Sequence, residues 1–76
     1  MEQLFELLKG VRKDVDFENE TALIDDGILD SFDVVSIISE IDNVFGVQIR
    51  ITELDPENFN SAESIWNLII ELKTKQ

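Results

Sequence analysis

Residues 30–46, with the sequence DSFDVVSIISEIDNVFG, carry the strongest structural signal in this chain of 76 residues. Apolar side chains recur there at a spacing of three and four residues, which predicts an amphipathic helix. Asp30 or Ser31 can cap its start by accepting a hydrogen bond from a free backbone N–H, and Asp33 places a negative charge in the first turn, where it suits the helix dipole. Gly46 is a suitable terminator. The predicted inward stripe consists of Val34, Val35, Ile37, Ile38, Ile41, Val44 and Phe45.

Phe32 lies on the side of this helix that is roughly opposite the stripe, among polar residues. We expect it to pack against the preceding loop; the alternative is an exposed apolar anchor for a partner protein. The helix contains many β-branched residues, which are poor helix formers, so burial in the tertiary structure must stabilise it.

Two further helices are predicted, one near each end of the chain. The first covers residues 2–13, where Leu4, Phe5, Leu7, Leu8 and Val11 fall on one face. The last begins at Asn60 or Ser61, and Asn60 with Glu63 resembles a capping box. Its apolar face consists of Ala62, Ile65, Trp66, Leu68, Ile69 and Leu72.

The connections between these helices differ in length. Residues 14–30 form a long polar connection with six large apolar residues, so we expect it to be packed against the core; loops of this length are usually functional. Residues 47–51 alternate like a strand, but one strand cannot form a sheet, so we interpret them as an extended connector. Residues 52–58 can form one helical turn capped by Thr52, and Pro56 limits its length.

The chain is therefore predicted to be a single all-α domain spanning residues 1–76. Its architecture is a small bundle of three main helices plus a short extra helical turn, with a long loop between the first and second helices. A domain of this length buries only about 60% of the surface of its unfolded chain, so its core is small.

Composition excludes several classes of function. The chain has no Cys and no His, which removes thiol nucleophiles, thiolate metal sites and the commonest general base, so we predict no catalytic residues and no metal site. The net charge of −11 opposes binding to nucleic acid and to anionic membranes. The N-terminus lacks the layout of a signal peptide, and no stretch of the chain approaches the roughly 18 apolar residues of a membrane span. We expect a cytoplasmic protein that is not an enzyme.

The acidic charge is concentrated in the middle of the sequence. Residues 14–63 contain fourteen acidic residues against Arg50 alone, a net of −13, whereas residues 1–13 and 64–76 each have a net of +1. This segment is either a solvated surface that keeps a small protein soluble or a surface that attracts basic partners.

One short motif remains as a candidate site, the octapeptide DGILDSFD at residues 26–33. Considered alone, it is a serine at the start of a capped helix, and Ser31 could serve as a cap and nothing more. However, this motif together with the helix after it and FGVQI at residues 45–49 resembles the phosphopantetheine-binding carrier proteins, which include acyl, peptidyl and D-alanyl carriers. The resemblance extends over essentially the whole chain.

The resemblance implies an acyl-carrier-protein-like fold and a 4′-phosphopantetheine arm, taken from coenzyme A, on Ser31. The arm would hold an acyl or aminoacyl group as a thioester. Implied partners are a phosphopantetheinyl transferase, an adenylating ligase or acyltransferase, and an enzyme that accepts the cargo. We expect a monomer whose partner-binding residues are Asp30, Phe32, Asp33, Glu40 and Asp42.

Two alternatives stay open within and beyond this family. The triplet Asp-Ser-Phe and the stretch from Ile51 to Asn60 look most like D-alanyl carriers, whereas Asp33 and Val34 depart from the small residues usual at those positions. The cargo can therefore be fatty acyl, aminoacyl or D-alanyl. The alternative from another class is an unmodified acidic helical interaction domain.

Overall fold

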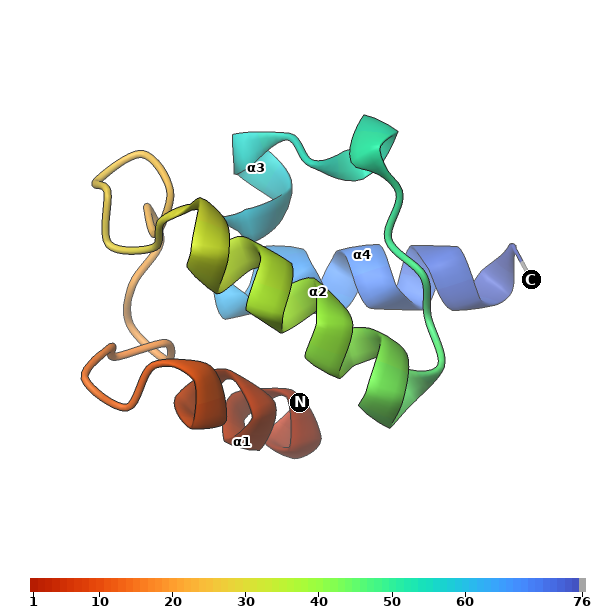
Figure 1. The fold of residues 1–76 in the computed structure, drawn as a ribbon, viewed down its shortest axis with the longest axis horizontal. Helices are drawn as coiled ribbons and strands as arrows, with labels where there is room; N and C mark the ends of the chain where they lie inside the picture. Colours follow the sequence, from red (N-terminus) through yellow and green to blue (C-terminus); the bar gives the residue numbers. More distant parts are fainter. Residues whose placement is uncertain (76) are drawn as a thin grey trace.

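The computed structural model describes residues 1–75, and within that range it contains helices, turns and irregular segments but no strand (Figure 1). The elements in chain order are α1 (Glu2–Val11), α2 (Ser31–Phe45), a 3₁₀ turn η1 (Ile51–Glu53), α3 (Pro56–Phe59) and α4 (Ala62–Thr74). The prediction of three main helices, a short extra turn and a long first loop is confirmed. In the described part of the chain no helix is both long and apolar enough to cross a membrane.

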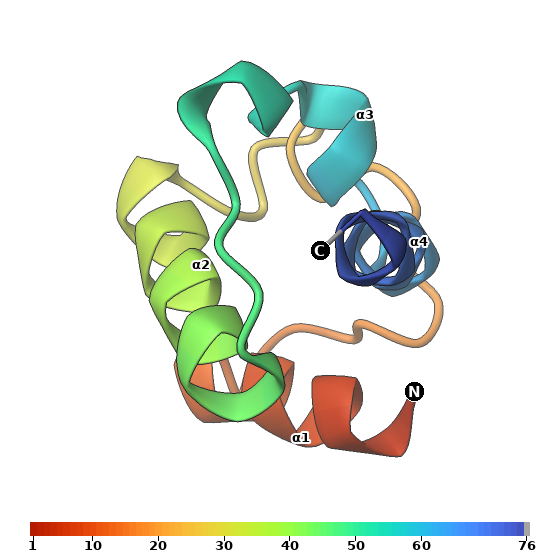
Figure 2. The same ribbon diagram turned by 90° about the vertical axis from the view of Figure 1, so that its right-hand side faces the viewer.

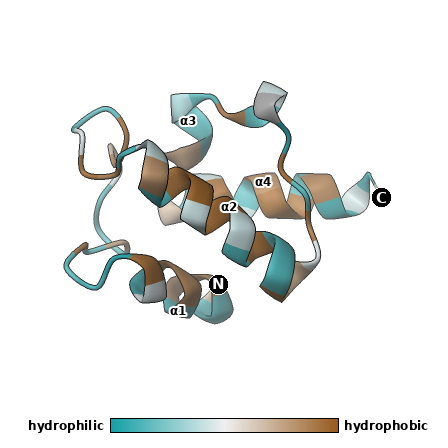
Figure 3. Ribbon diagram, in the orientation of Figure 1, coloured by the Kyte–Doolittle hydropathy of each residue, from teal (hydrophilic) through white to brown (hydrophobic). Residues whose placement is uncertain are grey.

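The core lies between α1, α2 and α4, which surround it in Figure 2. The long loop contributes to it, as expected, because Val15, Phe17, Leu23 and Leu29 are buried. Apolar residues lie mainly along the helices in Figure 3, while the turns are largely polar. The buried residues are Leu4, Leu7, Leu8, Val15, Phe17, Leu23, Leu29, Ile37, Ile41, Val47, Phe59, Ala62, Ile65, Leu68 and Ile69.

The inward stripe predicted for α2 is wrong at two positions. Ile37 and Ile41 are fully buried, but Val35 is 64% exposed and Val44 is 50% exposed. At about 100° per residue, Val35 lies roughly 120° away from Ile41 around the helix axis, so it points away from the core. The expectation that Phe32 packs against the loop is also wrong, because this residue is 83% exposed.

Two helical segments differ from the predictions in their bounds. α1 ends at Val11 rather than at residue 13, since Arg12 has extended backbone angles (φ −139°, ψ 99°). The turn expected from Thr52 is replaced by η1 and α3, and α3 begins at Pro56, whose fixed φ suits the first helical position.

The predicted capping box of Asn60 and Glu63 is wrong as well. Ser61 caps α4, and its hydroxyl accepts a hydrogen bond from the N–H of Ser64 at 3.0 Å. The side chain of Asn60 is engaged elsewhere: its Oδ1 accepts from the backbone N–H groups of Ile24 and Asp25 at 3.0 and 3.1 Å.

Candidate functional site

The start of α2 is closed by a reciprocal capping box. The carboxylate of Asp30 accepts from the N–H of Asp33 at 2.9 Å, and the carboxylate of Asp33 accepts from the N–H of Asp30 at 3.2 Å. Of the two caps considered from the sequence, Asp30 is therefore the one used. At the other end Gly46 has φ +68° and donates its N–H to the carbonyl of Asp42, as expected for a glycine terminator.

Ser31 is the first residue of α2 and is exposed. Because the carboxylate of Asp30 takes the capping bond, the Ser31 hydroxyl is not needed for it. Within residues 1–75 no hydrogen bond to this hydroxyl is formed, so it is available to a reaction partner.

The segment that leads to Ser31 is held by bonds to the rest of the fold. Gly27 adopts φ +69°, a left-handed conformation that suits glycine, and its N–H donates to the carbonyl of Ile24. The carbonyl of Asn60 accepts from the N–H of Leu23 at 2.8 Å, and its side-chain amide donates to Asp25 at 3.1 Å. The turn before Ser31 is thus fixed to the segment between α3 and α4.

An apolar hollow of about 320 Å³ lies next to Ser31. One wall is α2, another is the long loop, and Leu54 closes it from the segment after η1. Val35 and Leu54, two of its lining residues, leave a large part of their apolar surface exposed. The hollow is lined by Ile24, Leu29, Asp30, Ser31, Val34, Val35 and Leu54.

Arg12 forms the ion pair that joins the end of α1 to the start of α2. Its Nη1 donates to Asp33 at 2.6 Å and to the carbonyl of Ile28 at 3.3 Å. Its Nε and Nη2 donate to the two carboxylate oxygens of Asp14 at 2.9 and 2.8 Å. The hydrogen bond from Arg12 lowers the pKa of Asp14 to about 2, and the bonds to Asp14 and then Asp33 raise the pKa of Arg12 above its ordinary range.

The five predicted partner-binding residues do not form one patch. Asp30 and Phe32 are exposed at the Ser31 end, whereas the Asp33 side chain is only 14% exposed and is bound to Arg12. Glu40 and Asp42 are exposed farther along α2. Two residues apart on a helix, they point about 160° away from each other.

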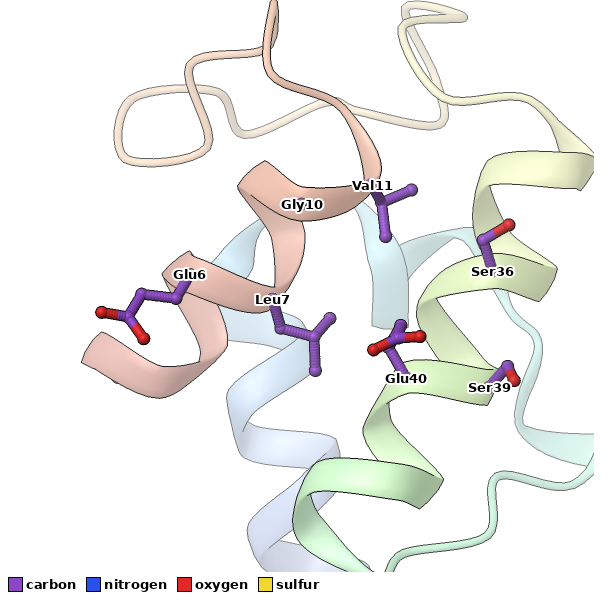
Figure 4. A pocket seen from close by; sticks show the side chains of 7 residues that line it. All are labelled: Glu6, Leu7, Gly10, Val11, Ser36, Ser39 and Glu40. Carbon is purple, nitrogen blue, oxygen red and sulfur yellow. The ribbon is translucent and has the colours of Figure 1, made fainter.

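Glu40 lines a separate groove of about 480 Å³ between α1 and α2. In Figure 4 the side chains of Leu7 and Glu40 reach into the space between the two helices, while the carboxylate of Glu6 points away from it. The remaining lining residues are Gly10, Val11, Ser36 and Ser39. This groove lies on the α1 side of α2, apart from the hollow beside Ser31.

Sequence reasoning missed Arg12, Asn60, Val35 and Leu54 as parts of this region. Val35 could have been recognised from its angular distance to the rest of the apolar stripe. Arg12 and Asn60 act through partners that are 21 and 35 positions away in the chain, and no local pattern indicates such a pairing.

Comparison with known proteins agrees with this geometry. No protein-family model matches the chain. A D-alanyl carrier protein of Bacillus velezensis is 36% identical over 64 residues, which are 84% of this chain and 77% of that protein. A D-alanyl carrier protein of Bacillus subtilis is 34% identical over 68 residues, which are 88% of this chain and 87% of that protein. With this identity and coverage, the all-helical fold and the exposed serine at the start of α2, the chain belongs to the acyl-carrier-protein-like family of carrier proteins.

Proposed function

We propose that this carrier protein bears a 4′-phosphopantetheine arm on Ser31 and passes a thioester-bound acyl or aminoacyl group between partner enzymes. One observation supports the proposal most directly. The Asp30 carboxylate caps α2, so the exposed Ser31 hydroxyl is not needed as a cap and is accessible for modification. The chain contains no Cys, so any thioester needs a thiol from an attached group. The arm supplies that terminal thiol.

The attachment is a group transfer that this site can accommodate. The Ser31 oxygen forms a bond to the phosphorus of the phosphopantetheinyl group of coenzyme A, the pyrophosphate P–O bond breaks, and adenosine 3′,5′-bisphosphate leaves. The hydroxyl proton passes to a base of the transferase. The Ser31 and Phe32 N–H groups, at the first two positions of α2, suit a neighbouring phosphate.

The protein is in this proposal a substrate of other enzymes and not itself a catalyst. Its partners are a phosphopantetheinyl transferase, an adenylating ligase or acyltransferase, and an enzyme that accepts the cargo. These reactions draw on coenzyme A and activated acids, which are cytoplasmic, and we place the protein there. A net charge of −11 opposes self-association, so we expect a monomer.

The partner surface proposed here has an apolar centre and a charged periphery. Phe32 is the apolar contact next to Ser31, and the exposed Asp30 on the other side of Ser31 attracts basic side chains of the partner. Glu40 and Asp42 point about 160° away from each other farther along α2, so they attract a basic partner over a longer range and do not belong to the same contact. Asp33 contributes mainly its charge to the local field, because its carboxylate is bound to Arg12. Contacts of this kind are weak and sensitive to salt, which suits a protein that must visit several enzymes in turn.

D-alanine is the cargo that we favour, because the two curated relatives described above are both named D-alanyl carrier proteins. The general carrier role does not depend on this choice. Fatty acyl and other aminoacyl groups remain the competing cargoes, and they are separated by the loading step of the experiment below.

The experiment is modification by a phosphopantetheinyl transferase with coenzyme A, followed by mass spectrometry of the intact protein. The wild type should gain the mass of one phosphopantetheinyl group, and Ser31→Ala should gain none. Ser36→Ala is the matched control, since Ser36 is an exposed serine of the same helix and its loss should leave modification unchanged. The modified protein is then offered D-alanine, L-alanine or a fatty acid with the corresponding ligases and ATP.

Three outcomes decide between the candidate functions. Modification at Ser31 followed by a second mass gain with D-alanine supports the full proposal. A second gain with another acid keeps the carrier role and removes the D-alanyl assignment. No mass gain with several competent transferases would overturn the proposal in favour of an unmodified helical interaction domain.

A further inference from the structure

Arg12 connects three separate parts of the chain near Ser31, the first residue of α2. Its guanidinium donates to Asp14 in the long loop, to the carbonyl of Ile28 just before α2, and to Asp33 in the first turn of α2. The one other ion pair among residues 1–75, between Glu71 and Lys75, lies within four residues at the end of α4. The Arg12–Asp33 pair is thus the ion pair in the described part of the molecule that joins residues far apart in the sequence.

The Arg12–Asp33 pair differs from an ordinary surface ion pair. The side chains of Arg12 and Asp33 are 31% and 14% exposed, so solvent screens this contact less than it screens the pair with Asp14, whose side chain is 67% exposed. The Asp33 oxygen that binds Arg12 also accepts from the N–H of Asp30. A chain of contacts therefore runs from Arg12 through Asp33 to Asp30, the residue directly before Ser31.

The charge at this turn presents a physical problem for the proposed arm. A phosphodiester on Ser31 adds a negative charge between Asp30 and Asp33, and coenzyme A itself approaches as an anion. Like charges at such short range oppose both events. The positive end of α2 offsets a part of this repulsion. Arg12 offsets the charge of Asp33 directly and holds its carboxylate in the capping box.

We propose that Arg12 is a positioning residue for modification at Ser31. It fixes the bend at Ile28 and the first turn of α2 against α1 and neutralises Asp33, so that an anionic donor can approach the Ser31 oxygen. This inference rests on the proposed arm at Ser31. It assigns to the guanidinium a role that depends on charge, beyond its contribution to the stability of the fold.

The test is a double-mutant cycle in the phosphopantetheinyl transfer assay, with kcat and KM measured for the intact chain. Arg12→Gln should lower kcat/KM by about fivefold, mainly through kcat, because the exposed docking residues are unchanged. Arg12→Gln should cost much less in the Asp33→Asn background, where no carboxylate is left uncompensated. Arg12→Lys keeps the charge and should recover most of the rate.

Asp14→Asn is the matched control, since it removes the exposed partner of Arg12 and leaves the contact with Asp33. Its rate should stay close to that of the wild type. A purely structural effect predicts a different pattern: partial unfolding lowers the concentration of competent substrate, which raises the apparent KM and leaves kcat at saturation unchanged. Circular dichroism at the assay temperature measures the folded fraction of each variant.

The inference is overturned if Arg12→Gln is modified at the wild-type kcat, or if its effect is equally large with Asn at position 33. If Arg12→Gln does not fold, the transfer rates of Arg12→Lys and Asp14→Asn decide. A folded Arg12→Lys protein that is not modified at all would contradict the role of charge. Failure of the wild type to be modified at all identifies failure of the proposed function, and the inference then falls with it.

Discussion

The starts of α2 and α4 are both capped by a side chain that accepts a free backbone N–H, but the capping groups differ chemically. At α4 the hydroxyl of Ser61 accepts the N–H of Ser64 at 3.0 Å, and the next residue, Ala62, is buried. At α2 the carboxylate of Asp30 accepts the N–H of Asp33, and the next residue, Ser31, is exposed. The hydroxyl of Ser61 is therefore bound to the backbone of its helix, while the hydroxyl of Ser31 is accessible.

This comparison shows that the role of a serine near a helix start depends on its position by a single residue. Ser61 occupies the cap position, where its oxygen replaces a missing intrahelical acceptor. Ser31 occupies the first helical position, because an acidic residue precedes it. The surroundings differ too, since Arg12 ties the α2 start to α1 through Asp33, whereas at the α4 start a hydrogen bond joins the hydroxyl groups of Ser61 and Ser64.

The largest effect expected from this contrast concerns the surface at the α2 start. Phe32→Ala should raise KM in the phosphopantetheinyl transfer assay by about tenfold, because an exposed aromatic residue beside the reacting group is a strong candidate for an interface anchor. Val44→Ala is the control, since it removes another exposed apolar side chain from the far end of the same helix. Equal KM values for the two variants would contradict an anchoring role for Phe32.

A smaller effect is expected for stability when the two serines are replaced separately. Ser61→Ala removes a helix cap and should lower the free energy of unfolding by about 1 kcal/mol. Ser31→Ala leaves the cap at Asp30 in place and should change it by less than about 0.5 kcal/mol. Urea unfolding followed by circular dichroism measures both. A loss of stability in Ser31→Ala as large as that in Ser61→Ala would restore a capping role for Ser31.

The smallest effect concerns the exposed partner of Arg12. The bond from Arg12 lowers the pKa of Asp14 to about 2 in the folded protein, below the ordinary value of about 4. A lowered pKa stabilises the fold above the unfolded-state value, and this contribution is lost as the pH falls from about 4 through about 2. The melting temperature of the wild type should therefore exceed that of Asp14→Asn at neutral pH, with the difference shrinking across that range. A difference independent of pH would show that Asp14 acts without its charge.

Much of the fold follows from local patterns in the sequence. The spacing of apolar residues and the glycine at position 46 indicated α2 correctly, because the helical period and the left-handed terminator are properties of short segments. The candidate serine was likewise evident from its motif. The short elements between α2 and α4 were less predictable, since a single turn contains too few residues to establish a period.

The composition and the periodicity of this sequence determined a small helical domain with no thiol of its own and a serine at the start of its central helix. Only the tertiary structure decided that Asp30, and not Ser31, caps that helix, and that Phe32 faces solvent. It also decided that Arg12 meets Asp33 and that Asn60 meets Asp25. The physical reason for the last two contacts is distance along the chain: they form between segments that approach each other only after the helices have packed, and no local pattern encodes them.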